Sequence, residues 1–141
     1  MKQSVILSIR GRQTYQEQEP EVIELVTEGV LEQLENGWEL TYEESALTGL
    51  QGVHTTFRIE PDQIVLTRTG KLNSQMIFRV GQVHESLYQV EFGALMICVM
   101  ASRIRSDITS QGGTVELEYA IEIEHTAAGV IDFYLQITPK P

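Results

Sequence analysis

The sequence predicts an all-β protein, a closed antiparallel meander β-barrel of about 8–10 strands. Three observations favour this fold class. Apolar and polar residues alternate with a period of two along most of the chain, as in strands with one buried face. Short segments with turn residues separate these runs, so consecutive strands are expected to be neighbours in space. No segment has an unambiguous helical pattern, and closure of the meander would remove exposed strand edges.

Residues 57–81 predict three of these strands together with their register. Glu60-Pro61-Asp62-Gln63 is a turn signal, because proline presets φ to about −65° and aspartate bonds its own backbone. We expect an even-length loop there and an odd-length, glycine-containing loop at Gly70-Lys71. The predicted opposite pairs are Ile59–Ile64, Phe57–Leu66, Thr55–Arg68, Leu66–Met76, Ile64–Phe78 and Arg68–Ser74.

The N-terminal part predicts three further strands. Residues 4–14 alternate, and a polar connection at residues 16–20 follows. Residues 21–35 are ambiguous, because valines recur at helical spacing whereas β-branched residues and Gly29 oppose a helix. We interpret this segment as a strand with a bulge near Gly29 that ends in an Asn36-Gly37 hairpin of unresolved register. Residues 38–44 alternate clearly before a connection at residues 46–52.

The C-terminal part predicts a hairpin, a polar loop and two long strands. A turn with Gly93 at its first central position would pair Phe92 with Leu95, and the same register pairs Val90–Ile97, Tyr88–Val99 and His84–Arg103. Residues 104–113 form the predicted loop, residues 114–125 alternate most clearly, and residues 127–129 turn the chain into a final core strand. The expected large inward side chains are Trp38, Phe57, Phe78, Phe92 and Phe133, which favour a filled interior.

Composition narrows the functions that fit this fold. With 141 residues the chain predicts a single domain, residues 1–141, and its net charge of −10 argues against binding to nucleic acid or an anionic membrane surface. The single cysteine, Cys98, is expected to be a buried small hydrophobe, and the absence of a disulfide framework favours a reducing compartment. Without a signal sequence or a long apolar run, we expect a cytoplasmic protein.

The ordered set of motifs resembles a known family. It comprises Leu40-Thr41-Tyr42-Glu43-Glu44, Leu66-Thr67-Arg68-Thr69-Gly70, Met76-Ile77-Phe78-Arg79-Val80-Gly81, Phe92-Gly93, residues 103–107 and residues 115–119. In these motifs the sequence resembles the YwiB-like family of small bacterial proteins, over nearly the whole chain. The resemblance implies a calycin-like, lipocalin-like β-barrel within a domain of unknown function. It supplies no catalytic residue, since the motifs resemble turn, core and rim positions.

Arg68 is the first candidate for a functional site, because its parity directs a guanidinium into the apolar face. An inward arginine needs acceptors. One interpretation pairs it with Glu44 or with strand-end carbonyls as a structural link; the other makes it an anion anchor beside the hydroxyls of Thr55 and Ser74. Tyr42 and Tyr119 share the inward parity and complete the predicted ligand-binding set. The sequence predicts no catalytic residue, no cofactor and no metal site.

Three functions are compatible with these residues. The first is a binding module that takes a small, partly apolar or anionic ligand near Arg68. The second is a filled structural or protein-interaction barrel without a ligand, and the third is a barrel-cavity enzyme in which Arg68 works with a tyrosine or Glu44. Met96 and Met100 lie on an outward face that is also apolar, so we expect it to be covered or to mediate a homo-oligomer.

Overall fold

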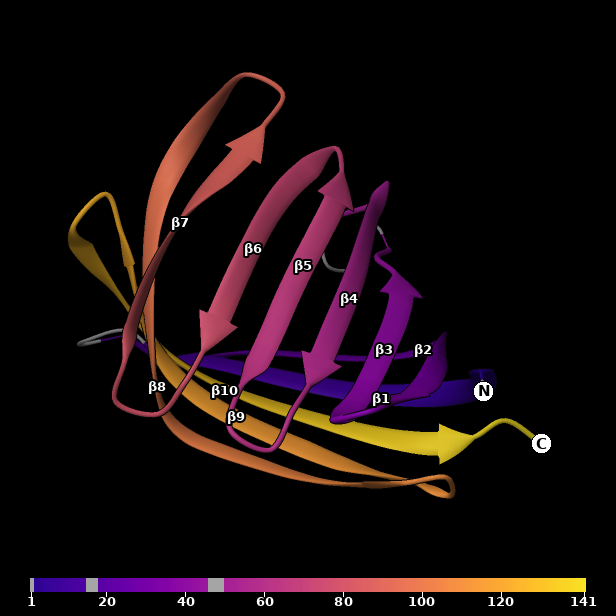
Figure 1. Ribbon diagram of the computed structural model, residues 1–141. Coiled ribbons are helices and arrows are strands. Elements are labelled where there is room, and N and C mark those ends of the chain that lie inside the picture. Colours follow the sequence, from indigo (N-terminus) through magenta and orange to yellow (C-terminus); the bar gives the residue numbers. More distant parts are fainter. Residues whose placement is uncertain (1, 15–17, 46–49) are drawn as a thin grey trace.

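The chain forms a closed barrel in which every strand pairs with its neighbours in sequence and the last strand pairs with the first (Figure 1). The structure is a computed structural model that describes residues 2–14, 18–45 and 50–141. Its strands are β1 Lys2–Thr14, β2 Glu21–Leu34, β3 Gly37–Glu43, β4 Val53–Ile59, β5 Ile64–Gly70, β6 Leu72–Phe78, β7 Val83–Val90, β8 Gly93–Thr109, β9 Gly112–Ile123 and β10 Thr126–Pro139. The prediction of an all-β antiparallel meander barrel is therefore confirmed.

Closure depends on a long antiparallel ladder between β1 and β10, from Val5 opposite Pro139 to Thr14 opposite Val130. Figure 1 shows β3 to β7 running across β1, β2, β9 and β10, while the long β8 bends from the first group into the second. Residues 16–17 and 46–49, which belong to two predicted connections, lie outside the described residues. The described part of the chain has no helix that is long and apolar enough to cross a membrane.

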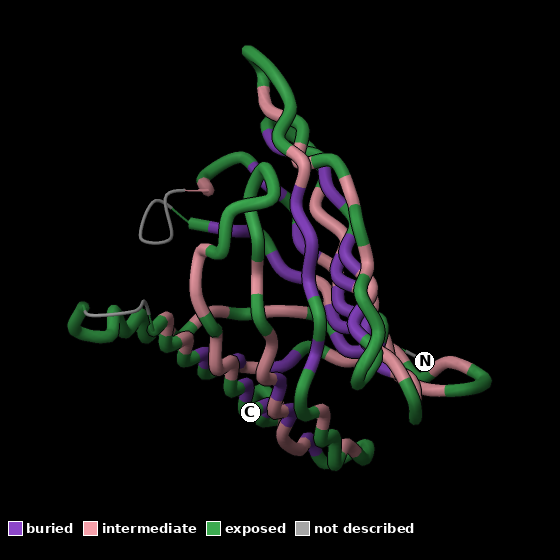
Figure 2. Tube along the Cα trace, turned by 90° about the vertical axis from the view of Figure 1, so that its left-hand side faces the viewer, coloured by how far each residue is buried: buried purple, intermediate pink, exposed green. Residues whose placement is uncertain are grey.

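Alternate residues of the long strands line the barrel interior and form its hydrophobic core. Figure 2 shows buried residues along the middle of the strands and exposed residues at the hairpin tips. Aromatic rings contact one another inside: Phe57 lies 5.3 Å from Phe133 and 6.3 Å from Tyr42, and Phe78 lies 4.6 Å from Tyr119, between ring centroids. Removal of this apolar surface from water is the main source of stability. The two-residue alternation predicted for these strands is thus the pattern that builds the core.

The register of β4, β5 and β6 agrees with the prediction. Ile59 lies opposite Ile64, and Arg68 lies opposite both Thr55 and Ser74. The turn at residues 60–63 is closed by a hydrogen bond from Glu60 N to Gln63 O of 2.9 Å. Turn chemistry and alternation are both local, so they specify this register without information from the rest of the barrel.

Residues 21–35 form a strand, as predicted, but the expected bulge at Gly29 is wrong. The ladder between β1 and β2 runs without interruption and passes through Val5 opposite Gly29. A Cβ at residue 29 would lie 2.8 Å from both Leu7 Cδ1 and Thr41 O, so glycine permits a close approach of neighbouring groups. The hairpin that follows turns at residues 35–36 rather than at Asn36-Gly37, which sets Leu31 opposite Leu40.

The predicted register of the β7–β8 hairpin is wrong by four residues. Val90 lies opposite Gly93 and Tyr88 opposite Leu95, so the turn is at residues 91–92. Phe92 is therefore at the hairpin tip with 93% of its surface exposed, instead of inside the barrel. A shift by an even number of residues, here four, preserves the inward face, and in the observed register Ile97 and Val99 are buried in the core.

The predicted polar loop at residues 104–113 is the second half of β8 and its turn into β9. A bulge between Ala101 and Arg103 changes the parity of β8, so inward positions move from odd to even residue numbers. This bulge places Arg103 outside, opposite Glu118 and not His84. The next turn also differs: residues 124 and 125 have φ of 51° and 65°, and the predicted turn at residues 127–129 is a bulge in β10.

Candidate functional site

Four of the six predicted site residues form one continuous row on the inner face of the barrel. In this row Tyr42 lies opposite Thr55, Thr55 opposite Arg68, and Arg68 opposite Ser74. The row crosses β3, β4, β5 and β6. Each of its four side chains points into the barrel, because successive side chains of a strand point alternately inward and outward. Tyr42, Thr55 and Ser74 are buried, and Arg68 is half-buried.

Glu44 joins this row from the segment that follows β3. Its backbone N–H donates to Val53 O over 2.9 Å, and its side chain is buried. Thr55 Oγ1 donates a hydrogen bond of 2.9 Å to Glu44 Oε1. The side chain of Glu44 is also hydrogen-bonded to Tyr42.

Two polar atoms in the row have no hydrogen-bond partner within the described protein. They are Arg68 Nε and Ser74 Oγ, and both are inaccessible to solvent. They belong to directly opposite residues on neighbouring strands, so the side chains lie next to each other. An unmade hydrogen bond in a buried place costs about 1–3 kcal/mol, so this pair of atoms is an unusual feature of the barrel interior.

Arg68 acts on the pKa of two tyrosine hydroxyls, those of Tyr42 on β3 and Tyr119 on β9. Burial raises the pKa of Tyr42 well above its usual value, and Glu44 raises it further, whereas Arg68 acts to lower it. Burial raises the pKa of Tyr119 to about 12, with Arg68 again lowering it and Tyr88 raising it. Both phenols therefore stay protonated at neutral pH and can donate hydrogen bonds.

The predicted set is therefore brought together by the fold, from β3, β4, β5, β6 and β9. Tyr119 reaches it from β9, where its ring packs on Phe78 with an interplanar angle of 48°. Tyr88 was not in the predicted set, although the alternation placed it on the same inward face as Tyr42 and Tyr119. It lies near Tyr119, whose pKa it raises. Among the described residues, no group of three or more His, Cys, Asp or Glu side chains could hold a metal ion.

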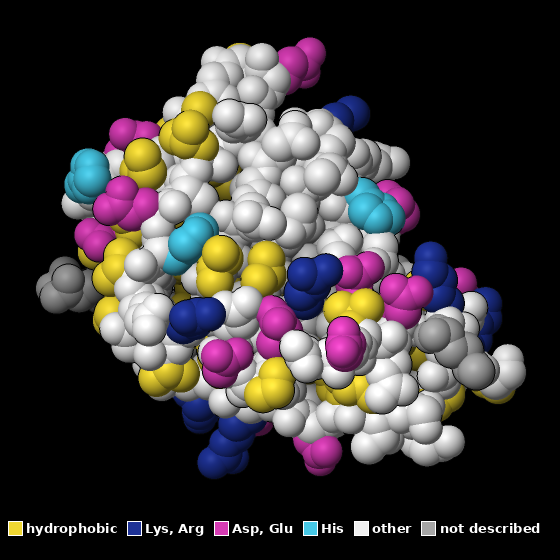
Figure 3. All heavy atoms as spheres, in the orientation of Figure 1, with side chains coloured by type: hydrophobic (Ala, Val, Ile, Leu, Met, Phe, Trp, Pro, Cys, Tyr) yellow, Lys and Arg dark blue, Asp and Glu magenta, His cyan; other side chains and the backbone are white. Residues whose placement is uncertain are grey.

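The outer face of β7 and β8 carries exposed apolar side chains. Val83, Met100, Ala120 and Val130 lie in one row across β7 to β10, and Val83 and Met100 are 65% and 41% exposed. Cys98 is buried in this face, as predicted, and burial together with Glu85 and Glu122 raises the pKa of its thiol. Figure 3 shows hydrophobic side chains exposed among acidic ones on the surface of the barrel. Self-association through Met96 and Met100 stays a prediction.

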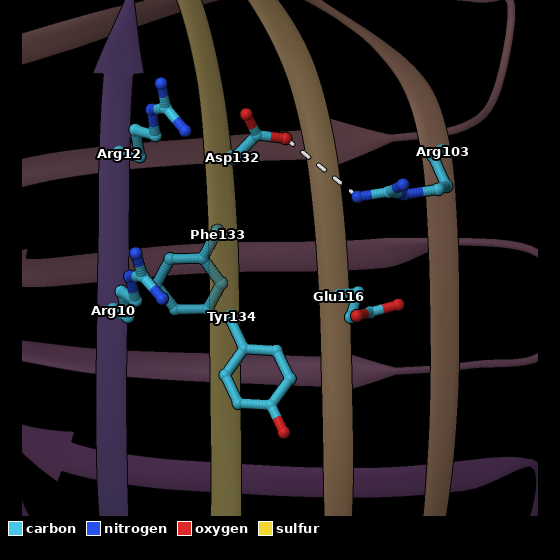
Figure 4. Close-up of a pocket in the computed structure, with 7 residues that line it drawn as sticks. All are labelled: Arg10, Arg12, Arg103, Glu116, Asp132, Phe133 and Tyr134. Carbon is cyan, nitrogen blue, oxygen red and sulfur yellow. Dashed lines mark ion pairs between the residues drawn. The ribbon is translucent and has the colours of Figure 1, made fainter. Parts of the chain in front are cut away.

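A hollow of about 350 Å³ on the outer face of the barrel was not predicted (Figure 4). Arg10 and Arg12 of β1, Arg103 of β8 and Asp132 of β10 line it, with Glu116, Phe133 and Tyr134. The available sequence signal was the outward parity of Arg10 and Arg12. Their proximity to Arg103 could not be predicted, because it depends on the β8 bulge and on closure between β1 and β10.

Fold and site together define a closed meander barrel with a buried row of polar side chains in an otherwise aromatic and aliphatic interior. A family model, the domain of unknown function DUF1934, matches residues 7–136. The chain belongs to this family. It is also similar to the crystal structure of the ywiB protein from Bacillus subtilis, with a TM-score of 0.87 and 19% sequence identity over 99% of this chain and 94% of that one. No curated protein matches the chain.

The structural similarity extends the family assignment to the architecture. At 19% identity it shows the shared fold alone, and the superposition covers nearly all of both chains. The predicted resemblance to the YwiB-like family is therefore confirmed. The family description contains no activity, so a function has to be inferred from the side chains of this barrel.

Proposed function

We propose that this protein binds a small, partly apolar molecule inside the barrel through a carboxylate or a similar acceptor group. The observation that carries the proposal is the pair of inaccessible donors, Arg68 Nε–H and the hydroxyl of Ser74, which have no partner among the described residues. An acceptor oxygen between them would satisfy both donors at once. A guanidinium is the side chain best suited to an anionic oxygen, because its N–H groups form a planar fork.

The surroundings of the two donors support a ligand of mixed character. Tyr119 offers a protonated hydroxyl, as its raised pKa requires, whereas the hydroxyl of Tyr42 is hydrogen-bonded to Glu44. Phe57 and Phe78 are buried, and their rings contact Tyr42 and Tyr119. Such walls favour an apolar or aromatic body attached to the acceptor group, the combination typical of small-molecule sites.

The hydrogen bonding of Glu44 also favours a ligand with an acceptor group. Its carboxylate accepts from Thr55, so the hydroxyl of Thr55 is directed away from Arg68 toward Glu44. The donors that remain for a ligand are therefore those of Arg68 and Ser74. We infer that a carboxylic acid with a short aromatic or aliphatic body fits better than a cation, since a cation would face the guanidinium directly.

Thermal stabilisation by a panel of small acids tests the proposal. Benzoate, phenylacetate, hexanoate and octanoate are compared with benzyl alcohol and hexanol, which keep the apolar body and lose the charge. Native mass spectrometry of protein purified from its own host searches in parallel for a retained small molecule. We expect at least one acid to stabilise the wild type more than its alcohol does.

A matched pair of arginine variants assigns any binding to the interior. Arg68→Met removes the inward guanidinium, whereas Arg58→Met removes an outward one on the adjacent strand, whose side chain is 54% exposed. Loss of binding in the first variant alone supports the site. Equal binding in both variants, or no stabilisation by any acid and no retained molecule, would favour a filled barrel without a ligand.

A further inference from the structure

We propose a second binding site, on the outside of the barrel, in which Arg12 and Arg103 hold the phosphate or carboxylate group of a small molecule. The site is the 350 Å³ hollow over β1, β10, β9 and β8 (Figure 4). It is separate from the interior row around Arg68 and does not depend on the function proposed for that row. Its volume is in the range of small-molecule sites.

The ladder places two arginines at the ends of one row of outward side chains. Arg12 of β1 lies opposite Asp132, Asp132 opposite Glu118, and Glu118 opposite Arg103 of β8. The next row repeats the arrangement, with Arg10 opposite Tyr134 and Tyr134 opposite Glu116. Guanidiniums thus flank the hollow on both sides, and three of the ten Lys and Arg residues of a chain with net charge −10 line it.

The two carboxyl groups in the middle of the row, those of Glu118 and Asp132, are hydrogen-bonded to each other. Glu118 accepts a hydrogen bond of 2.8 Å from Ser102 Oγ and is hydrogen-bonded to Asp132. These bonds lower the pKa of Glu118, whereas burial and Glu118 raise the pKa of Asp132. Arg103 and Arg12 act in the opposite direction on the pKa of Asp132, so both arginines lie close enough to this carboxyl group to interact with it.

The guanidiniums keep most of their donors. Arg103 Nη2 is 3.9 Å from Asp132 Oδ1 and Arg10 Nε is 3.6 Å from Glu24 Oε1, both longer than the roughly 2.7–2.9 Å of a charge-assisted hydrogen bond. Within the part of the chain that the structure describes, Arg12 has no ion pair. Each guanidinium has five N–H donors, so an incoming oxyanion finds unused donors on both sides.

The β8 bulge builds this arrangement. Between Ala101 and Arg103 the register shifts, so that Ser102 and Arg103 are both exposed on the outer face. Ser102 then reaches Glu118, and Arg103 extends toward Asp132. Bulges re-aim side chains in this way and are frequent beside functional sites. Tyr134 provides a ring surface at the hollow, which favours a flat organic body over a bare inorganic ion.

Titration of the arginine Nε–H signals by NMR tests this site with three probes at constant ionic strength: phenyl phosphate, benzoate and inorganic phosphate. We expect saturable shifts of Arg12 and Arg103 with phenyl phosphate or benzoate, and weaker binding of inorganic phosphate. Stronger binding of phenyl phosphate than of benzoate would assign a phosphate ligand, and the reverse a carboxylate.

Variants then locate the binding. Arg12→Gln and Arg103→Gln are each expected to raise the Kd about tenfold or more, because each removes charge-assisted hydrogen bonds. Arg58→Gln, a control on the outer face of β4 that is 3.9 Å from Glu39, should leave the Kd unchanged. Linear, unsaturable shifts would overturn the proposal. So would binding that survives the Arg12→Gln/Arg103→Gln double variant but is lost in Arg68→Met, since the probe would then occupy the interior.

Discussion

Replacement of Arg68 by methionine separates the two roles that an inward arginine can have. Its Nε is inaccessible and has no hydrogen-bond partner in the part of the chain that the structure describes, and the side chain is half-buried. An unmade buried hydrogen bond costs about 1–3 kcal/mol, and methionine fills a similar elongated space with an apolar, adaptable chain. We expect the ligand-free variant to gain about 1 kcal/mol in the free energy of unfolding, the lower end of that range, because the partly exposed guanidinium is partly hydrated.

The assay is urea denaturation of wild type and variant, followed by tryptophan fluorescence, with the m-value checked for constancy. A ligand at a hundred times its Kd stabilises the wild type by about 2.7 kcal/mol, and this gain should vanish in the variant. A loss of about 3–5 kcal/mol in the ligand-free variant would refute the reasoning, since that is the cost of breaking a paired buried charge. Arg68 would then be a structural link in the barrel wall.

Three further predictions concern the buried hydroxyl of Tyr119, the close approach at Gly29 and the outer face of β7 and β8. Burial raises the pKa of Tyr119 from 10.0 to about 12, so its contribution to stability is complete below pH 10 and is lost as the pH rises toward 12. Alkaline urea denaturation should therefore show wild type losing about 1.4 kcal/mol per pH unit more than Tyr119→Phe in this window; parallel curves would contradict the burial of this phenol. Gly29→Ala should cost about 1–3 kcal/mol, because its Cβ would be 2.8 Å from Thr41 O, whereas Gly11→Ala, with nothing within 4 Å of its Cβ, should be neutral or stabilising in the same assay. If the predicted homo-oligomer forms through the β7–β8 face, Met100→Glu should reduce its mass in sedimentation equilibrium, while Val26→Glu on β2, at a site that is 71% exposed, should not; equal masses would exclude that face as the interface.

The buried row is the part of the candidate site that local sequence information was sufficient to predict. Thr55, Arg68 and Ser74 lie on strands joined by turns whose residues indicate the loop length, so alternation alone brings them side by side. Glu44 was predicted in the set, with a pair to Arg68 as one interpretation, whereas its hydrogen bond from Thr55 was not predicted. Which donor a buried carboxylate finds depends on side-chain geometry that alternation does not contain.

Alternation and turn chemistry, read along the chain, determine that this protein is a closed antiparallel barrel and that a guanidinium faces its interior. They fail where a strand gains a residue, because a bulge reverses which positions face inward beyond it. The predicted loop after Arg103 is the second half of β8, which continues beyond the bulge. Pairing of β1 with β10 places Arg12 at the same hollow as Arg103. Contacts between residues so distant in sequence follow from the complete set of strand pairings, and only the tertiary structure contains them.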